Sequence, residues 1–247
     1  MNIMVCIDDT DNLNSPGTGD LAESIAAGIT RTRGASCSMI SRHQLYIHED
    51  IPYTSHNSSM CFRAVIQTEQ LEDIIQFGST FLEETSAPGS DPGLCVVNVD
   101  KLSTPDALIT FGTLAKKQVL TKKEAYETAK NLGIHLSEHG GTGNGVIGAL
   151  AGTGLRLGGN DGRFKGWMHF EGRERIMKAG RLYDSPFVDR VCTREGVCIS
   201  PDTDIFVDYK VKTVLLDHKA TVLVAPAQET GSVSSWRTLK KRELKVY

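Results

Sequence analysis

The segment Asn2-Ile3-Met4-Val5-Cys6-Ile7-Asp8-Asp9-Thr10-Asp11 decides the expected fold of this chain. Residues 2–7 form a nearly continuous apolar run, which predicts a short strand inside a sheet that is covered on both faces. Carboxylates end the run, and turn-forming residues follow at 12–19. We therefore expect a core strand whose carboxyl end carries acidic side chains.

Amphipathic helices and further strands alternate after this first strand. A helix is expected over Asp20–Arg33, because Asp20 and Glu23 have the spacing of a capping box and Gly34 suits a C-cap. The other candidates are strands at 37–41, 44–48, 60–67, 94–99 and 134–136 and helices at 69–84, 121–133 and 146–157. This alternation predicts an α/β or α+β core.

Beyond residue 166 the pattern changes to short strands. A helical pattern persists briefly over 172–179, and then Val211–Leu216 and Thr221–Ala225 flank a short polar turn, which indicates a hairpin. The basic segment 232–247 is typical of a solvated or frayed terminus, with an RNA or phosphate contact as the alternative. We predict two domains, a core at 1–165 and a small β-rich domain with a basic tail at 166–247.

Composition narrows the class of protein. The 247 residues include 27 basic and 30 acidic ones, a net charge of −3, which argues against a nucleic-acid binder held by a positive field over the whole chain. No apolar run reaches the length of a membrane span, and the N-terminus lacks the basic region of a signal peptide. The six cysteines lie mostly within apolar runs, as expected of buried thiols. We therefore expect a cytoplasmic protein.

The acidic cluster suggests a cation site. Asp8, Asp9 and Asp11 repel one another unless a cation or hydrogen-bond donors compensate, and Mg²⁺ takes one or two carboxylates together with phosphate oxygens. Gly17-Thr18-Gly19 precedes a helix N-terminus, where amides favour an anion and the Thr18 hydroxyl can reach metal or phosphate. The alternative is a capped turn without a ligand. The loop lacks the Gly-Lys-Ser/Thr ending of a Walker A motif.

A glycine-rich segment gives a second candidate phosphate contact. Gly140 to Gly148 leads into a helix of small residues, and Gly141, Gly143, Asn144 and Gly145 are expected to close over a nucleotide. The alternative is tight helix packing, since Gly148 and Gly152 leave one helix face without side chains. The spacing Gly143-x-Gly145-x-x-Gly148 also fits a dinucleotide fingerprint, although the preceding strand is short and no acidic partner follows at the expected distance.

Two histidines are candidates for a general base. His56 and His139 lie in polar or glycine-rich loops, whereas the other histidines are typical of structural positions. Cys192 and Cys198 form a single pair, which is too few ligands for a structural zinc site.

Four segments form an ordered set of motifs over about residues 1–160. They are Ile7-Asp8-Asp9-Thr10-Asp11 with Gly17-Thr18, Glu49-Asp50-Ile51-Pro52-Tyr53-Thr54-Ser55-His56-Asn57, Ser90-Asp91-Pro92-Gly93-Leu94 and Gly143-Asn144-Gly145-Val146-Ile147-Gly148-Ala149-Leu150-Ala151. In this order they resemble the archaeal tRNA(Ile) agmatinylcytidine synthetase (TiaS) family, in its catalytic core only.

The resemblance implies an ATP- and Mg²⁺-dependent core made of a kinase-like α/β domain and a ferredoxin-like α+β part. In the family, ATP activates the C2 carbonyl of a tRNA cytidine and agmatine displaces the activated oxygen. It further implies that Asp8, Asp9 and Asp11 bind metal and phosphates. Thr18 matches a threonine that the family's enzyme phosphorylates on itself.

The chain departs from the family in three places. Gly17-Thr18-Gly19 stands where the family has Cys-Thr-Thr, and Tyr53 and Ser55 stand where it has a lysine and an arginine, which removes phosphate-binding charge. The region after Gly166 is short and lacks the four paired cysteines of the family's zinc ribbon, and an OB domain is not recognisable. Those parts hold the tRNA in the family.

The leading hypothesis is an ATP/Mg²⁺-dependent ligase or kinase-like transferase that activates an oxygen of an unidentified acceptor, a small molecule or RNA, by phosphoryl or nucleotidyl transfer. The alternative is a non-catalytic nucleotide-binding module or subunit that works with a separate RNA-binding partner. A nicotinamide-dependent oxidoreductase rests on the glycine fingerprint alone. The oligomeric state, a homodimer included, stays open.

Overall fold

The computed structural model describes residues 1–52, 56–170, 175–227 and 235–247, and they form two compact units, 1–158 and 159–247. The sequence placed the boundary at 165/166. In the structure, Arg163–Phe164 (β7) pairs with Val214–Leu216 (β13), so the short segment before 166 already belongs to the second unit. No helix in the described ranges combines the length and apolar character needed to cross a lipid bilayer.

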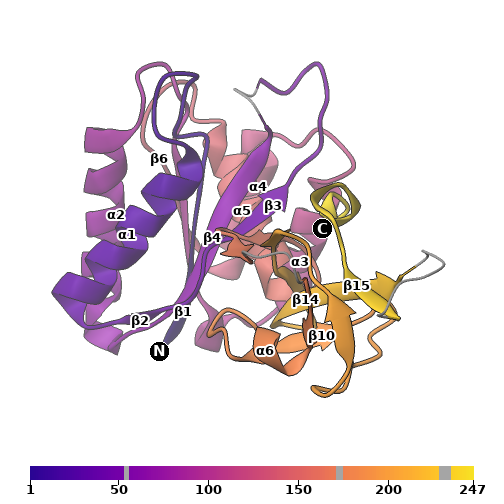
Figure 1. Cartoon of the computed structure of the whole chain (residues 1–247). Coiled ribbons are helices and arrows are strands. Elements are labelled where there is room, and N and C mark those ends of the chain that lie inside the picture. The colour runs from indigo at the N-terminus through magenta and orange to yellow at the C-terminus, as the bar shows by residue number, and fades with distance from the viewer. Residues whose placement is uncertain (53–55, 171–174, 228–234) are drawn as a thin grey trace. The chain divides into compact units, whose positions relative to one another are not determined.

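The first unit is an antiparallel sheet with helices on both faces (Figure 1). Its strand order is β6-β5-β1-β4-β3, with β2 also pairing with β4. The strands are β1 (Asn2–Asp8), β2 (Ser36–Cys37), β3 (Ser41–Gln44), β4 (Ser58–Val65), β5 (Gly93–Asn98) and β6 (His135–Glu138). The helices are α1 (Thr18–Arg33), α2 (Leu71–Thr85), α3 (Pro105–Leu114), α4 (Lys122–Leu132) and α5 (Gly145–Gly158). The order β1-α1-β3-β4-α2-β5 is the βαββαβ motif of ferredoxin-like folds.

Strand β1 divides the core of the first unit into two layers. Ile3, Val5 and Ile7 pack with α1 and α2, whereas Met4 and Cys6 face α3, α4 and α5. Residues 3–7 are at most 1 % exposed, which confirms the expected strand covered on both faces. The fold is therefore the expected mixture of helices and sheet, in its α+β form.

Helix α5 lies unusually close to the sheet because its small residues face the strands. A Cβ at Gly152 would overlap Ser59 and lie 2.7 Å from the Cys6 sulfur. Cys6 is itself the middle of a row of three buried cysteines, paired in register with Cys61 of β4 and Cys95 of β5. The expected glycine face of this helix is confirmed, and it fixes the helix start against the end of β1.

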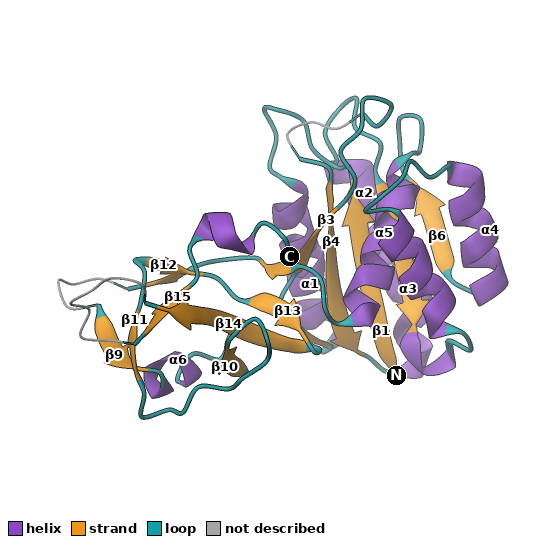
Figure 2. Cartoon of the chain, turned by 90° about the vertical axis from the view of Figure 1, so that its right-hand side faces the viewer, coloured by secondary structure: helices purple, strands orange, loops and turns teal. Residues whose placement is uncertain are grey.

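The second unit is made of short strands, as predicted, with two short helical segments among its described residues, α6 (Gly180–Tyr183) and a 3-10 helix at Lys241–Leu244 (Figure 2). Its main strand order is β7-β13-β14-β15-β11-β9, and β10 (Arg190–Cys192) pairs with β14. The other strands are β9 (Ile176–Lys178), β11 (Asp204–Phe206), β14 (Lys219–Pro226) and β15 (Trp236–Thr238), and β8 (Met168–His169) pairs with β12 (Lys210–Val211). The predicted hairpin is present, with Asp217 and His218 at φ 51° and 60° in its turn.

Four local expectations are wrong. The strand expected at 37–41 is interrupted, since β2 ends at Cys37 and β3 begins at Ser41, and residues 45–48 are not a strand, since β3 ends at Gln44. The helical pattern at 172–179 gives strand β9 over its last part, while 171–174 lie outside the described residues. The basic terminus is not frayed. Leu239 and Leu244 are buried in a hydrophobic cluster, and Arg237 forms a two-point ion pair with Glu243, with N–O distances of 2.8 and 2.9 Å.

Glu243→Gln is expected to destabilise the second unit by about 1 kcal/mol at pH 7. The hydrogen bonds from Arg237 lower the pKa of Glu243 to about 2, so the stabilisation is present above pH 4.5 and is lost as the pH falls towards 2. Both tryptophans, Trp167 and Trp236, lie in this unit, so tryptophan fluorescence during urea unfolding reports its stability. Asp202→Asn, at an exposed position, is the control, and a difference that persists unchanged at pH 2 would contradict the argument.

Candidate functional site

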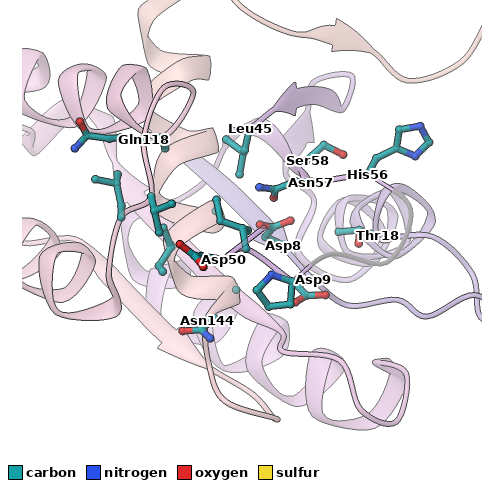
Figure 3. Close-up of a pocket in the computed structure, with 18 of the residues that line it drawn as sticks. Asp8, Asp9, Thr18, Leu45, Asp50, His56, Asn57, Ser58, Gln118 and Asn144 are labelled. Carbon is teal, nitrogen blue, oxygen red and sulfur yellow. The ribbon is translucent and has the colours of Figure 1, made fainter. Parts of the chain in front are cut away.

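A cavity of about 160 Å³ opens in the first unit where β1 ends (Figure 3). Its lining includes Asp8, Asp9, Asp11 and Thr18, together with Asn144 and the first residues of α5, Gly145, Ile147 and Gly148. The remaining lining residues are Leu45, Asp50, Ile51, Pro52, His56, Asn57, Ser58, Ala115, Gln118, Val119 and Leu120. The acidic cluster and the glycine-rich segment, more than 130 residues apart in sequence, therefore border one space.

Asp8 is the last residue of β1 and is buried beneath the start of α5. A Cβ at Gly148 would overlap the Asp8 carboxylate, so glycine there is what allows the carboxylate and the helix to lie in contact. Burial, followed by the negative charges of Asp9 and Asp11, raises the pKa of Asp8 to about 8, and a backbone hydrogen bond from Asp9 opposes part of this rise. The site therefore holds a carboxylate whose charge is poorly compensated by the described residues.

Asp9 follows directly and has a left-handed backbone conformation, with φ 49°. Aspartate tolerates this region better than most residues other than glycine. Burial, followed by the charges of Asp91 and Asp11, raises the pKa of Asp9 to about 6. Two adjacent carboxylates at the cavity thus favour protonation or a bound cation.

Thr18 begins helix α1 and is tied to Asp11. Its hydroxyl donates to Asp11 Oδ1 at 3.0 Å, and Gly17 is the N-cap residue. The first amides of a helix have no intrahelical acceptor and lie at the positive end of its dipole. Thr18 lines the cavity, whereas Gly17 and Gly19 do not.

The donor atoms fit a hard cation. Among the described residues, no group of three or more His, Cys, Asp and Glu side chains is arranged to enclose a metal ion. Mg²⁺ does not need such a group, because it keeps water and phosphate oxygens and uses one or two carboxylates. Asp8 and Asp9 offer oxygen ligands, and both have pKa values raised by burial and like charge, which a cation would reverse.

The glycines of the 140–148 segment contact protein carboxylates. Gly141 and Gly143 have φ values of 55° and 76°, and a Cβ on them would overlap Asp91 and Glu138 respectively. Asp91 Oδ1 accepts the Thr142 amide at 2.5 Å, and Lys122 donates to the Thr142 carbonyl at 2.7 Å. Asn144 and Gly145 line the cavity, whereas Gly141 and Gly143 do not. A nucleotide contact of the latter two stays a prediction.

The two candidate bases have different surroundings. His56 lines the cavity but is exposed, and in Figure 3 its ring points away from Asp8. His139 does not line the cavity. Its Nε2 lies 2.8 Å from Ser137 Oγ and its Nδ1 lies 3.2 Å from Glu83 Oε1. Tyr53 and Ser55, which stand where the TiaS family has a lysine and an arginine, lie outside the described residues.

Sequence reasoning missed several lining residues. Asp50 and Asn57 line the cavity. Both belong to the motif at residues 49–57, and membership of that motif was the only feature of the sequence that pointed to them. Gln118 follows the unpredicted helix α3, so nothing in the local pattern pointed to it. Asp91 is buried and acts on the pKa of Asp9, although it does not line the cavity.

The dinucleotide fingerprint is wrong as a fold signature. The glycines follow β6, which pairs antiparallel with β5 at the edge of the sheet. A Rossmann site needs a parallel βαβ unit in which the glycines follow a central strand. The expectation of an oxidoreductase therefore loses its structural basis.

Comparison with solved structures shows that the chain has a TiaS-like fold. TiaS in complex with an isoleucine tRNA and ATP matches with a TM-score of 0.56 and 22 % identity, over 81 % of this chain and 49 % of that chain. A tRNA fluorescent labeling enzyme matches with a TM-score of 0.55 and 22 % identity, over 76 % of this chain and 46 % of that one. Apo TiaS, a tRNA agmatidine synthetase, matches with a TM-score of 0.55 and 20 % identity, over 81 % of this chain and 48 % of that chain.

The chain spans about half the length of these solved structures. No family model matches it, and no curated protein matches it in sequence.

Proposed function

We propose that the chain is an ATP- and Mg²⁺-dependent enzyme that activates an oxygen of an acceptor by phosphoryl or nucleotidyl transfer. The observation that carries this proposal is the meeting of Asp8, Asp9, Asp11 and Thr18 with the start of α5 around one cavity. An acidic wall suits a cation, and the N-terminal ends of α1 and α5 on the cavity suit the phosphates of the same ligand. The fold shared with the complex of TiaS, tRNA and ATP supports the nucleotide.

Each residue has a distinct role in this proposal. Asp8 and Asp9 would hold Mg²⁺, which neutralises phosphate charge when bound. Asp11 orients the Thr18 hydroxyl through their 3.0 Å hydrogen bond and can accept its proton if Thr18 takes a phosphoryl group. Asn144 and Gly145 lie where the phosphates would be, and His56 is the candidate base for the acceptor. Gly17, Gly19, Gly141 and Gly143 belong to the same two segments and do not themselves line the cavity.

The cavity volume indicates which part of ATP it encloses. Sites that enclose a whole drug-sized ligand measure roughly 300–1,000 Å³, and this cavity measures about 160 Å³. We infer that the cavity takes the metal and the phosphates, while the nucleoside lies outside it. The acceptor is a small molecule or RNA, and we place the protein in the cytoplasm.

Asp9→Asn is expected to lower the affinity for MgATP at least tenfold, measured by isothermal titration. Asparagine also tolerates the left-handed backbone at this position, so the variant removes charge with little effect on folding. Asp106→Asn, at an exposed position in the first turn of α3, is the matched control. Equal affinity of wild type and Asp9→Asn, or no binding by the wild type, would reject the nucleotide site.

Product analysis separates the enzyme from a binding module. The second candidate is a nucleotide-binding module that acts with a separate RNA-binding partner. Tyr53 and Ser55, which stand where the TiaS family has a lysine and an arginine, favour it. Release of ADP or AMP on incubation with a panel of amines and RNAs supports the enzyme and identifies the phosphate that is attacked. MgATP binding without any release supports the module.

A further inference from the structure

A second cavity, of about 410 Å³, lies in the second unit and combines aromatic rings with basic side chains. Trp167, Asp208, Tyr209, Lys210 and Lys241 line it. Trp167 directly precedes β8 and Tyr209 directly precedes β12, and these two strands pair antiparallel. Val211 pairs with Met168, and the Phe170 amide donates to the Tyr209 carbonyl at 3.0 Å. Backbone pairing therefore joins the two segments that carry the rings.

Cations hold the rings in place. The Arg175 guanidinium lies 4.1 Å from the centre of the Tyr209 ring and 4.5 Å from that of Phe206. Lys212 Nζ lies 4.6 Å from the centre of the Trp167 ring. Such cation–π contacts restrict the rings and so prepare flat surfaces on which another ring can stack. Tyr209 is 56 % exposed, so its ring is accessible despite these contacts.

The charge of the cavity favours an anion. Its one acidic residue among the described lining, Asp208, already pairs with Arg175 at 3.5 Å, which leaves the charges of Lys210 and Lys241 to dominate that lining. An aromatic cage for an organic cation would need an excess of acidic residues instead.

The charge of the whole second unit points the same way. It has 16 basic and 12 acidic residues, a net charge of +4, whereas the first unit has 11 basic and 18 acidic residues, a net charge of −7. Such asymmetry within a chain indicates a polyanionic partner for the basic part.

We propose that this cavity binds single-stranded nucleic acid, with a base stacked on Trp167 or Tyr209 and phosphates on Lys210 and Lys241. Aromatic rings beside basic residues are the recurring means of holding unpaired strands, because every base has a flat face and every linkage a charge. The inference uses only the second unit and does not rest on the proposed ATP site. Lipid surfaces also attract basic and aromatic residues, but here the rings line a cavity.

Binding is tested with the full chain, without ATP or Mg²⁺, by fluorescence anisotropy of a labelled 12-nucleotide RNA. Single-stranded RNA should bind at least tenfold more tightly than a duplex of the same length, because a duplex hides its base faces. Trp167→Ala should weaken binding about tenfold or more, and Trp167→Phe should keep most of it. In a plot of log affinity against log salt concentration, Lys210→Gln should reduce the magnitude of the slope by about 0.7, because one phosphate contact is lost. Lys219→Gln, exposed on the hairpin of the same unit, is the control and should change neither value beyond its small effect on net charge.

Several results would overturn the proposal. These are the absence of RNA binding, equal affinity for the duplex, undiminished binding by both Trp167→Ala and Lys210→Gln, or binding to anionic vesicles that depends on Trp167 more strongly than binding to RNA does. Quenching of Trp167 fluorescence by RNA in a Trp236→Phe background gives a readout of stacking that does not depend on affinity. The affinity for a single-stranded DNA of the same sequence shows whether the protein contacts the 2′-hydroxyl groups of RNA. Binding of both DNA and RNA supports the proposal. MgATP titration of the same samples shows whether the first unit is intact.

Discussion

Asp8→Asn is expected to make the metal-free protein more stable at pH 8 and to abolish its response to Mg²⁺ and ATP. In the wild type, the pKa of Asp8 is raised from 3.8 to about 8, mainly by burial. The protonated form is thus favoured in the folded state, and the stability it contributes is present below pH 4 and is lost as the pH rises through 8. Asparagine has nearly the same shape and does not ionise. With about 1.4 kcal/mol for each unit of pKa shift, the gain is on the order of several kcal/mol.

The measurement is urea unfolding followed by far-UV circular dichroism from pH 4 to 8, because all described helices longer than four residues lie in the first unit. In EDTA, the wild type should lose stability across this range, and Asp8→Asn should lose less, with a remaining slope near pH 6 from Asp9. Excess Mg²⁺ and ATP should restore the wild type but not the variant. Asp106→Asn should follow the wild type. A variant that is less stable than the wild type at pH 8 in EDTA would show that Asp8 is compensated within the protein.

Gly148→Ala is expected to weaken nucleotide binding because the new methyl group displaces the Asp8 carboxylate. The methyl group itself is not expected to contact the nucleotide. The new methyl group would occupy the space of the Asp8 carboxylate, which is buried and has little room to move. Overpacking of this kind destabilises a protein by about 1–3 kcal/mol. The displaced carboxylate would also lose its alignment with Asp9, and we expect at least a tenfold loss of MgATP affinity by isothermal titration.

Helix α5 supplies its own control for this experiment. A Cβ at Gly158, near the end of the same helix, would meet its nearest neighbour, Ile109, at an ordinary 3.4 Å. Gly158→Ala should therefore bind MgATP normally and unfold at the same or a slightly higher urea concentration, since alanine favours helix over glycine. If both alanine variants bind MgATP like the wild type, the contact between Gly148 and Asp8 does not position the site.

Local signals in the sequence were sufficient for most elements of the first unit. The apolar run of β1, the capping pair Thr121 and Glu124 and the glycines at 34 and 133 are short-range features, and the structure has these elements at or near their expected bounds. The capping pair expected at Asp20 and Glu23 is wrong, because α1 begins two residues earlier and Gly17 is its N-cap residue. The direction of the strands was not predictable in this way. Both neighbours of β1 run antiparallel to it, and the apolar run of residues 2–7 carries no sign of their direction. Pairing joins residues about 60 and 90 positions apart, and no local pattern records it.

The missed and misplaced elements have similar causes. Helix α3 begins at Pro105 with few charges to mark an exposed face, and its burial comes from a close contact with α5 through Gly112 and Gly154. At the candidate site, the acidic cluster was visible because its residues are adjacent in sequence. Asp50 and Gln118 were not, because only the folded chain brings them to the cavity.

The left-handed backbone at residue 9 also bears on how this protein can diverge. Any aspartate codon becomes a glycine codon by a single nucleotide change, and glycine adopts a φ of 49° without the steric penalty of about 1 kcal/mol that a side chain brings. A single mutation can therefore remove a carboxylate that is proposed to hold metal without lowering the stability of the fold. After gene duplication, one copy of this chain can lose its proposed activity by this single step and still fold. In related sequences, glycine at position 9 would mark such an inactive copy.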